Sequence, residues 1–178
     1  MMDMGYNRKL ILEDGEEYYG FAFGYTGDKV LEIVFNTSMV GYQEILSDPS
    51  YTDQAVVMTY PLIGNYGMAA DDYETKVPTV GAFIVREYND EPSNFRSEKG
   101  LAEVMIQHKI SGIYGIDTRK LTRSIRNKGS RKCLLTSADT SLAVGLQILS
   151  NTVIPKDAVS RVSCGRIWRS EKIGRAHV

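Results

Sequence analysis

Two cysteines and two histidines are the side chains of this 178-residue sequence that could supply a strong nucleophile or a neutral base. A catalytic cysteine needs such a base beside it. His108 lies on the apolar face of a predicted helix, which favours a packed or capping histidine, and His177 lies in an irregular tail. Cys133 falls in a predicted strand, and Cys164 lacks the flanking glycines of a Gly-x-Cys-x-Gly turn. The sequence therefore predicts no catalytic residue.

Two further patterns could bind ions. Asp71, Asp72 and Glu74 are close in sequence, but their spacing matches no calcium loop, so we interpret them as a solvated acidic loop. The GNYG stretch at 64–67 could hold an anion on backbone amides, although a tight turn after a strand explains it equally well. It has neither the Lys-Ser/Thr ending of a P-loop nor the dinucleotide glycine pattern. We therefore expect no metal and no cofactor here.

The segment 117–132, DTRKLTRSIRNKGSRK, is strongly basic. A basic helix could bind nucleic acid, but no aromatic residue is interleaved for base stacking, and the whole chain has a net charge of −1. We interpret the segment as a solvated helix face or a protein-contacting surface. Nucleic-acid binding is kept as an alternative, which predicts strong salt sensitivity. The basic residues are Arg119, Lys120, Arg123, Arg126, Lys128, Arg131 and Lys132.

The stretch from Phe35 to Gly67 has a different character, because it contains no His, Cys, Lys or Arg. Neutral donors and acceptors alternate there with apolar groups. This mixture suits a hydrated, specific interface or the recognition of a polar ligand, rather than acid–base catalysis. A set of hydrogen-bonded turns between strands is the alternative interpretation. The polar residues are Thr37, Ser38, Tyr42, Gln43, Ser47, Ser50, Tyr51, Thr52 and Tyr60.

The elements that position these residues follow from periodicity and turn signals. Asp117 and Asp139 are predicted to cap helices, with Leu121 and Ile125 on the buried face of the first. Strands come mostly before helices, which predicts a mixed α/β domain with a mixed sheet and helices mainly in the second half. We expect strands at 9–13, 17–24, 30–36, 55–60, 78–86 and 130–136, and helices at 41–46, 98–108, 117–128 and 139–150.

The overall composition is that of an ordinary globular domain. Hydrophobic residues make up 43% of the sequence and charged residues 24%, and a chain of this length can bury a core without metal or disulfide support. The first fifteen residues contain no apolar run suited to a signal peptide or a membrane span. The two cysteines form no disulfide framework. We expect a cytoplasmic protein that binds neither membrane nor nucleic acid.

Several long motifs resemble the small, glutamine-using subunit of carbamoyl-phosphate synthetase, over its N-terminal half. They are EIVFNTSMVGYQEILSDPSY at 32–51, TYPLIGNYG at 59–67, LEDG to GFAFG at 12–24, SNFR at 93–96 and GIDTRKLTR at 115–123. They occur in the family's order and extend over about residues 8–164. Leu31 departs from the family, which usually has glycine there.

The resemblance implies a fold, a partner and a reaction. The expected fold is a β/β/α swivelling-type domain that docks onto the large subunit in a heterodimer. A following amidotransferase domain would release ammonia from glutamine with a Cys-His-Glu triad. The large subunit, which would bind ATP and Mg, would convert ammonia and bicarbonate to carbamoyl phosphate for pyrimidine and arginine synthesis. This domain itself would carry no cofactor.

The resemblance also assigns one site residue. In the family, the serine of the Asp-Pro-Ser-Tyr motif lies beside the glutamine site, and that serine is Ser50 here. Its hydroxyl would contact the amino-acid end of glutamine without taking part in bond breaking. The stretch around it would form one wall of an interdomain site, and part of a docking scaffold.

The sequence departs from the family after about residue 164. No nucleophile turn and no His and Glu of an amidotransferase are present before Val178, and neither cysteine inherits the nucleophile role. We therefore predict a small-subunit N-terminal domain at 1–164, and we interpret 165–178 as a tail from truncation or read-through. The chain alone is expected to have no glutaminase activity. A free-standing, non-catalytic binding module is the alternative function.

Overall fold

A computed structural model describes residues 5–68, 74–75, 77–89, 91 and 99–166 of the chain. Asp71 and Asp72 of the acidic loop lie outside the described residues, as do the SNFR motif at 93–96 and His177. The structure therefore does not test the predictions made for them. Within the described part of the chain, no helix combines the length and the apolar character needed to cross a membrane.

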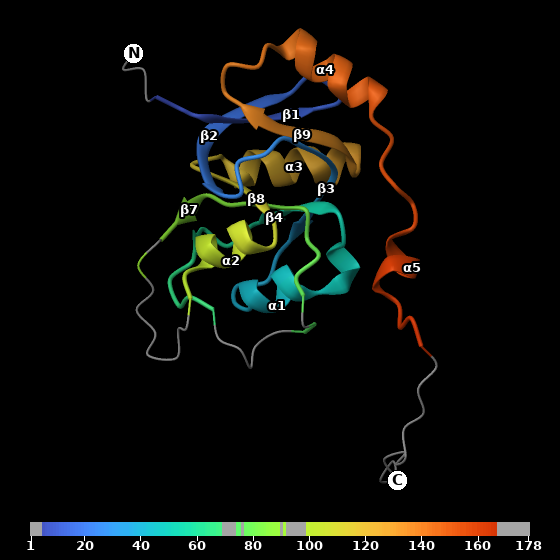
Figure 1. Cartoon of the computed structure of the whole chain (residues 1–178). Coiled ribbons are helices and arrows are strands. Elements are labelled where there is room, and N and C mark those ends of the chain that lie inside the picture. The colour runs from blue at the N-terminus through green and yellow to red at the C-terminus, as the bar shows by residue number, and fades with distance from the viewer. Residues whose placement is uncertain (1–4, 69–73, 76, 90, 92–98, 167–178) are drawn as a thin grey trace, which may run out of the picture.

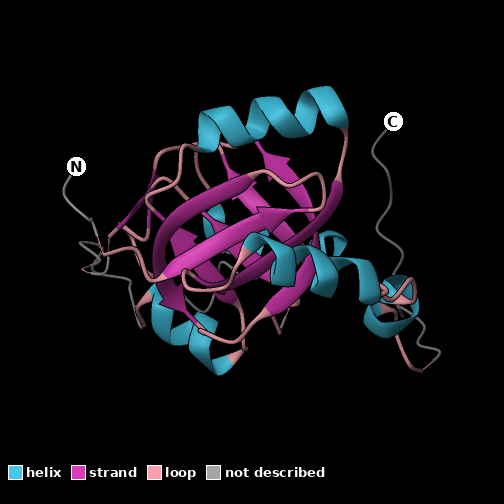
Figure 2. Ribbon diagram, turned by 90° about the horizontal axis from the view of Figure 1, so that it is seen from above, coloured by secondary structure: helices cyan, strands magenta, loops and turns pink. Residues whose placement is uncertain are grey.

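Seven strands form a closed barrel (Figure 2). Around the barrel they follow the order β1-β2-β8-β6-β4-β3-β9, and β9 pairs with β1 to close it. The pairings among β3, β4, β6 and β8 are parallel, and the other four are antiparallel. The strands are β1 (Arg8–Leu12), β2 (Glu17–Gly24), β3 (Lys29–Asn36), β4 (Gln54–Met58), β6 (Ala82–Ile84), β8 (Ser111–Tyr114) and β9 (Arg131–Ser137).

Alternate residues of the strands fill the barrel interior, as the two-residue period of a strand requires. Helix α3 (Thr118–Lys128) closes one end of the barrel, because its Leu121 and Ile125 belong to the same core cluster as the interior residues. The interior residues are Leu10, Leu12, Leu31, Ile33, Ala55, Val57, Ala82, Ile84, Ile113, Cys133 and Leu135.

The other helices cover the outside of the barrel. α1 (Tyr42–Ser47) and α2 (Leu101–Gln107) pack on the outward residues of β2, β4 and β6, forming a second core cluster. α4 (Leu142–Asn151) packs on the outer side of β1 and β9 at the opposite end of the molecule (Figure 1). Burial on both faces explains why β4 and β6 are apolar at nearly every position.

Short elements complete the structure. A 3-10 turn, η1 (Pro49–Tyr51), follows α1, and a short helix, α5 (Ala158–Val162), follows α4. β5 (Leu62–Ile63) and β7 (Glu87–Tyr88) form a separate parallel pair.

The predicted fold class is confirmed: the sheet is mixed, and α2 to α5 all lie after residue 100. The strands predicted at 9–13 and 17–24 are confirmed as β1 and β2, which pair across a turn where Gly15 has a φ of 87°. The cap expected at Asp139 is wrong, since α4 begins after Ser141, whose hydroxyl accepts from the Val144 N–H at 3.4 Å. Both residue types cap well, and the chain uses the later one.

Two expectations about strands also need correction. The strand predicted at 78–86 is only three residues long, because β6 comprises Ala82–Ile84. The prediction did not include β8, whose short SGIY sequence has no alternating pattern. Pairing with β2 and β6 creates this strand, so tertiary contacts outweigh its weak local preference.

Candidate functional site

The segment 48–53, called here the Ser50 loop, is a rigid turn at the edge of the barrel. Pro49 begins the turn, and the Asp48 carboxylate accepts from the Ser50 N–H at 2.8 Å. The Thr52 hydroxyl donates to the Pro49 carbonyl at 2.7 Å. These contacts fix the backbone on both sides of Ser50. Ser50 itself is exposed, and its hydroxyl has no hydrogen-bond partner among the described residues.

Contacts beneath the loop hold it on the barrel. The Tyr51 hydroxyl accepts from the Asn36 amide at 3.0 Å, at the end of β3. Thr52 is buried, its hydroxyl lies 2.8 Å from that of Thr79, and it forms a backbone bridge with Val80. Hydrogen bonds therefore hold the side chains of Asp48, Tyr51 and Thr52, whereas the Ser50 hydroxyl faces solvent.

Tyr42 and Tyr66 of the Phe35–Gly67 stretch have structural roles. Tyr42 stacks on Tyr66 with ring centroids 4.1 Å apart, and the Tyr66 hydroxyl accepts from the N–H groups of Gly41 and Tyr42. The Tyr42 hydroxyl donates to the Gly67 carbonyl at 2.8 Å, and burial raises the pKa of Tyr42 well above its usual range. Tyr66 thus supplies the start of α1 with an acceptor, since Gly41 has no side chain to do so.

The GNYG stretch is a tight turn. Gly64 and Gly67 have φ values of 96° and 64°, and the Gly67 N–H donates to the Gly64 carbonyl at 3.2 Å. A Cβ on Gly64 would lie 2.2 Å from the Asn89 carbonyl oxygen, so the turn requires glycine there. The interpretation as a turn explains these glycines fully.

An apolar cavity of about 130 Å³ lies beside this turn and is lined by Met39, Val40, Tyr42 and Leu62, among others. Met39 and Val40 are 71% and 78% exposed. Two large apolar side chains at the mouth of an apolar cavity are typical of a protein-contacting surface.

The residues first considered for catalysis do not form a site. Cys133 is buried in the barrel interior, and burial raises the pKa of its thiol far above its usual range, so it is inert. Cys164 is exposed beyond α5. His108 is half-buried at the C-terminal end of α2, as the packed or capping interpretation predicts. No hydrogen bond links these residues to one another or to Ser50 in the described part of the chain.

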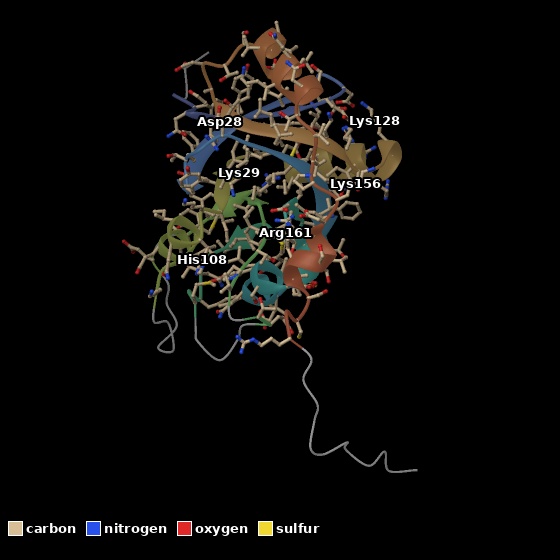
Figure 3. All side chains as sticks on the ribbon, turned by 45° about the vertical axis from the view of Figure 1, so that its right-hand side comes forward. Asp28, Lys29, His108, Lys128, Lys156 and Arg161 are labelled. Carbon is tan, nitrogen blue, oxygen red and sulfur yellow. The ribbon has the colours of Figure 1, made fainter. Side chains whose placement is uncertain are left out.

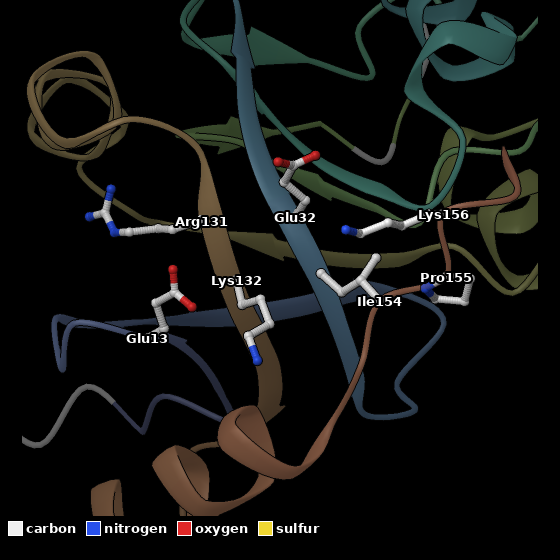
Figure 4. Close-up of a pocket in the computed structure, with 7 residues that line it drawn as sticks. All are labelled: Glu13, Glu32, Arg131, Lys132, Ile154, Pro155 and Lys156. Carbon is white, nitrogen blue, oxygen red and sulfur yellow. The ribbon is translucent and has the colours of Figure 1, made fainter. Parts of the chain in front are cut away.

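No group of three His, Cys, Asp or Glu side chains among the described residues could hold a metal ion. A larger charged cleft of about 390 Å³ lies on the outside of β3 and β9 (Figure 4). Lys132 is one of its lining residues. Its ammonium already donates hydrogen bonds to the carbonyls of Leu149 and Thr152, at 2.6 and 3.2 Å. The chain segment that follows α4 therefore forms one wall of this cleft.

The basic segment forms α3, as predicted. The Asp117 carboxylate accepts from the Lys120 N–H at 2.9 Å, and the helix ends at Gly129. Arg123 and Arg126 are exposed, whereas Lys128 forms ion pairs with two acidic residues of the β1–β2 turn. The prediction that this helix does not bind nucleic acid stays a prediction.

Comparison with known proteins reveals a family. Residues 10–135 match the family model described as carbamoyl-phosphate synthase small chain, CPSase domain. The carbamoyl phosphate synthase small chain of Fusobacterium nucleatum is 52% identical over 170 residues, covering 96% of this chain and 47% of the relative. The pyrimidine-specific small chain of Bacillus subtilis is 46% identical over 168 residues, covering 94% of this chain and 46% of the relative.

The chain spans less than half the length of these relatives. The matched range runs from Leu10 in β1 to Leu135 in β9, so it includes nearly all of the barrel, together with the Ser50 loop and α3. The family match covers most of the sequence and agrees with the resemblance of its motifs. The chain therefore belongs to the carbamoyl-phosphate synthase small-chain family.

Proposed function

We propose that residues 1–164 form the N-terminal domain of the small chain of a glutamine-hydrolysing carbamoyl-phosphate synthase. In this proposal the small chain releases ammonia from glutamine, and a large chain uses that ammonia, bicarbonate and ATP to make carbamoyl phosphate. This domain contributes a wall of the glutamine site and a docking surface, and performs no bond breaking. The family match and the names of the relatives support the assignment.

The geometry of the Ser50 loop is the observation that carries the site. A serine hydroxyl that is exposed on a backbone fixed by Asp48, Thr52 and Tyr51 is preorganised to hydrogen-bond a polar ligand. A glutamine molecule bound by a following amidotransferase domain would offer an α-carboxylate or α-amino group to it. Ser50 would position glutamine, because the described residues place no base beside its hydroxyl.

The partner and setting follow from the same proposal. The exposed Met39 and Val40 at the apolar cavity support docking onto another protein, for which the large chain is the proposed partner. ATP and Mg would bind to the large chain, and this domain would carry no cofactor.

The Bacillus subtilis relative is named pyrimidine-specific, which supports pyrimidine synthesis as one pathway, with arginine synthesis as another. The proposed location is the cytoplasm.

A chimeric small chain tests the function. Residues 1–164 are joined to the C-terminal half of the Fusobacterium nucleatum relative and assembled with a carbamoyl-phosphate synthase large chain. The chimera is expected to make carbamoyl phosphate from glutamine. Ser50→Ala is expected to raise KM for glutamine about tenfold, the equivalent of one hydrogen bond, without changing synthesis from added ammonia. The unfused chain should release no ammonia from glutamine.

Ser150→Ala is the matched control, because this exposed serine on α4 lies at the far end of the molecule from α1 (Figure 1). Its KM for glutamine should equal that of the parent chimera. Turnover of glutamine by the unfused chain would contradict the proposed division of labour. An unchanged KM in Ser50→Ala would remove Ser50 from the glutamine site.

A further inference from the structure

The chain from Thr152 to Val162, called here the strap, runs from the end of α4 down one side of the barrel to the neighbourhood of the Ser50 loop. In Figure 1 it leaves α4 at the top right and reaches α5 beside the lower helices. Figure 3 shows Lys156 and Arg161 along this path. The strap therefore connects the two ends of the molecule without adding a strand to the barrel.

The upper end of the strap is held by Lys132 of β9. Its ammonium donates to the carbonyls of Leu149 and Thr152, which satisfies acceptors left open at the end of α4. Ile154 and Pro155 then line the charged cleft, and Figure 4 shows Lys156 pointing toward β3. The hydrogen bonds from Lys132 therefore fix the position of the first residues of the strap.

The lower end of the strap is held by an ion pair between Arg161 of α5 and Asp53 of the Ser50 loop. Within α5, the Arg161 Nε also donates to Asp157 at 3.0 Å, so the guanidinium is oriented between two carboxylates. The side chains of Arg161 and Asp53 are 43% and 35% exposed. The pair is thus accessible to solvent, and it joins two segments that otherwise share few contacts.

Apolar packing does not determine the position of α5. Val159 and Val162 are 77% and 38% exposed, and no residue of this helix is buried. A five-residue helix is too short to be stable by itself in water. The ion pair is consequently the main contact that places α5 beside the Ser50 loop.

The Asp53 end of the pair is rigid. Asp53 has a φ of 57°, a left-handed conformation that Asp and Asn tolerate better than other side chains. Its N–H donates to the Thr79 carbonyl at 3.1 Å, and it follows the buried Thr52 directly. Asp53 and Ser50 belong to the same fixed turn, so the Asp53 carboxylate keeps a fixed position relative to Ser50.

We propose that Asp53 and Arg161 form a clasp that sets the position of the strap, and of a domain attached beyond it, relative to Ser50. Both are positioning residues for the use of glutamine, since neither needs to touch the ligand. The inference rests on the proposed function for its consequence, whereas the clasp itself is a property of this chain. The exposed valines of α5 would then pack on the attached domain.

The first test uses the 178-residue chain. Asp53→Asn keeps the left-handed preference and removes the charge, and Arg161→Gln removes the other charge. Each is expected to speed hydrogen exchange at the amides of Arg161 and Ser163 by about threefold to tenfold, and the double variant should add nothing further. Arg126→Gln, on the exposed face of α3, is the control and should leave these amides unchanged. Unchanged exchange in the single variants, or additive effects, would overturn the clasp.

The second test measures glutamine use in the chimera described above. Asp53→Asn and Arg161→Gln are expected to raise KM for glutamine about threefold to tenfold, with synthesis from added ammonia unchanged. Arg161→Lys, which keeps the charge, should recover part of the loss. If Ser50→Ala raises KM and the clasp variants do not, the positioning role is wrong and the proposed function stands. If Ser50→Ala also has no effect, the role of Ser50 fails, and the positioning role fails with it.

Discussion

Lys128 and Arg161 each form an ion pair with a segment that is far away in sequence, and the two contacts connect different parts of the molecule. Lys128 of α3 reaches Asp14 and Glu16 of the β1–β2 turn, across 114 and 112 positions. Arg161 of α5 reaches Asp53 across 108 positions. The first contact joins the barrel to the helix that closes it, whereas the second joins the barrel to a strap on its surface.

Their surroundings differ more than their chemistry. At the turn, Arg131 lies 3.3 Å from Asp14 with its side chain only 6% exposed, and Tyr18 and Ser124 donate to the two oxygens of Glu16. We call this group the hairpin network. The Arg161 side chain is 43% exposed, and its helix buries no residue. An ion pair stabilises a fold when buried neighbours share it, and otherwise determines mainly where a segment lies.

The largest expected effect is in the hairpin network. Arg131→Ala should lower the free energy of unfolding by about 2–4 kcal/mol, because a nearly buried cation that also donates to Ser124 and to the Gly129 carbonyl is lost beside Asp14. Urea denaturation measures the change. Arg126→Ala, at an exposed position of the preceding helix α3, is the control and should cost less than about 0.5 kcal/mol. A loss below about 0.5 kcal/mol in Arg131→Ala would erase the difference between the two regions.

A smaller effect, which depends on pH, is expected at Glu16. Hydrogen bonds from Lys128 and Tyr18, aided by Ser124, lower the pKa of Glu16 to about 2. A carboxylate with a lowered pKa in the folded state adds stability above its ordinary pKa, and that stability is lost as the pH falls toward 2. Glu16→Gln should therefore cost about 1–2 kcal/mol at pH 7, and progressively less as the pH falls below about 4.5.

Unfolding free energies of Glu16→Gln and the parent chain at pH 7, 4 and 2.5 test this sign. Glu13→Gln is the matched control, because Glu13 is an exposed acid of the same turn with no ion pair among the described residues. A difference between parent and Glu16→Gln that stays constant over this pH range would contradict the shift.

Local signals were sufficient to predict α3 and the strands β1 and β2. Asp117 as a cap, Leu121 and Ile125 as a stripe and Gly129 as a stop all lie within thirteen residues, so the sequence alone determines that helix. Closure of the barrel could not be predicted in this way. The pairing of Leu10 with Leu135 joins residues 125 positions apart, and no local pattern marks it.

Part of the candidate site was likewise predictable from the sequence, and part of it was not. Ser50 was predicted from the resemblance of its motif, and the structure adds the reason that its turn is rigid. The clasp between Asp53 and Arg161 had no signal in the sequence, because an exposed ion pair leaves neither periodicity nor a cap. The left-handed backbone of Asp53 is visible only in the fold.

The smallest expected effect on stability belongs to the clasp. Arg161→Gln should leave the urea midpoint of global unfolding unchanged, although it frees α5 locally. The reason is that α5 contributes nothing buried to the barrel, so the barrel unfolds with the same free energy whether the strap is attached or not. Urea denaturation followed by the barrel tyrosines measures this. A clear fall of the urea midpoint would mean that the strap is part of the folded core, and the distinction between a contact that stabilises the fold and a contact that positions a segment would fail.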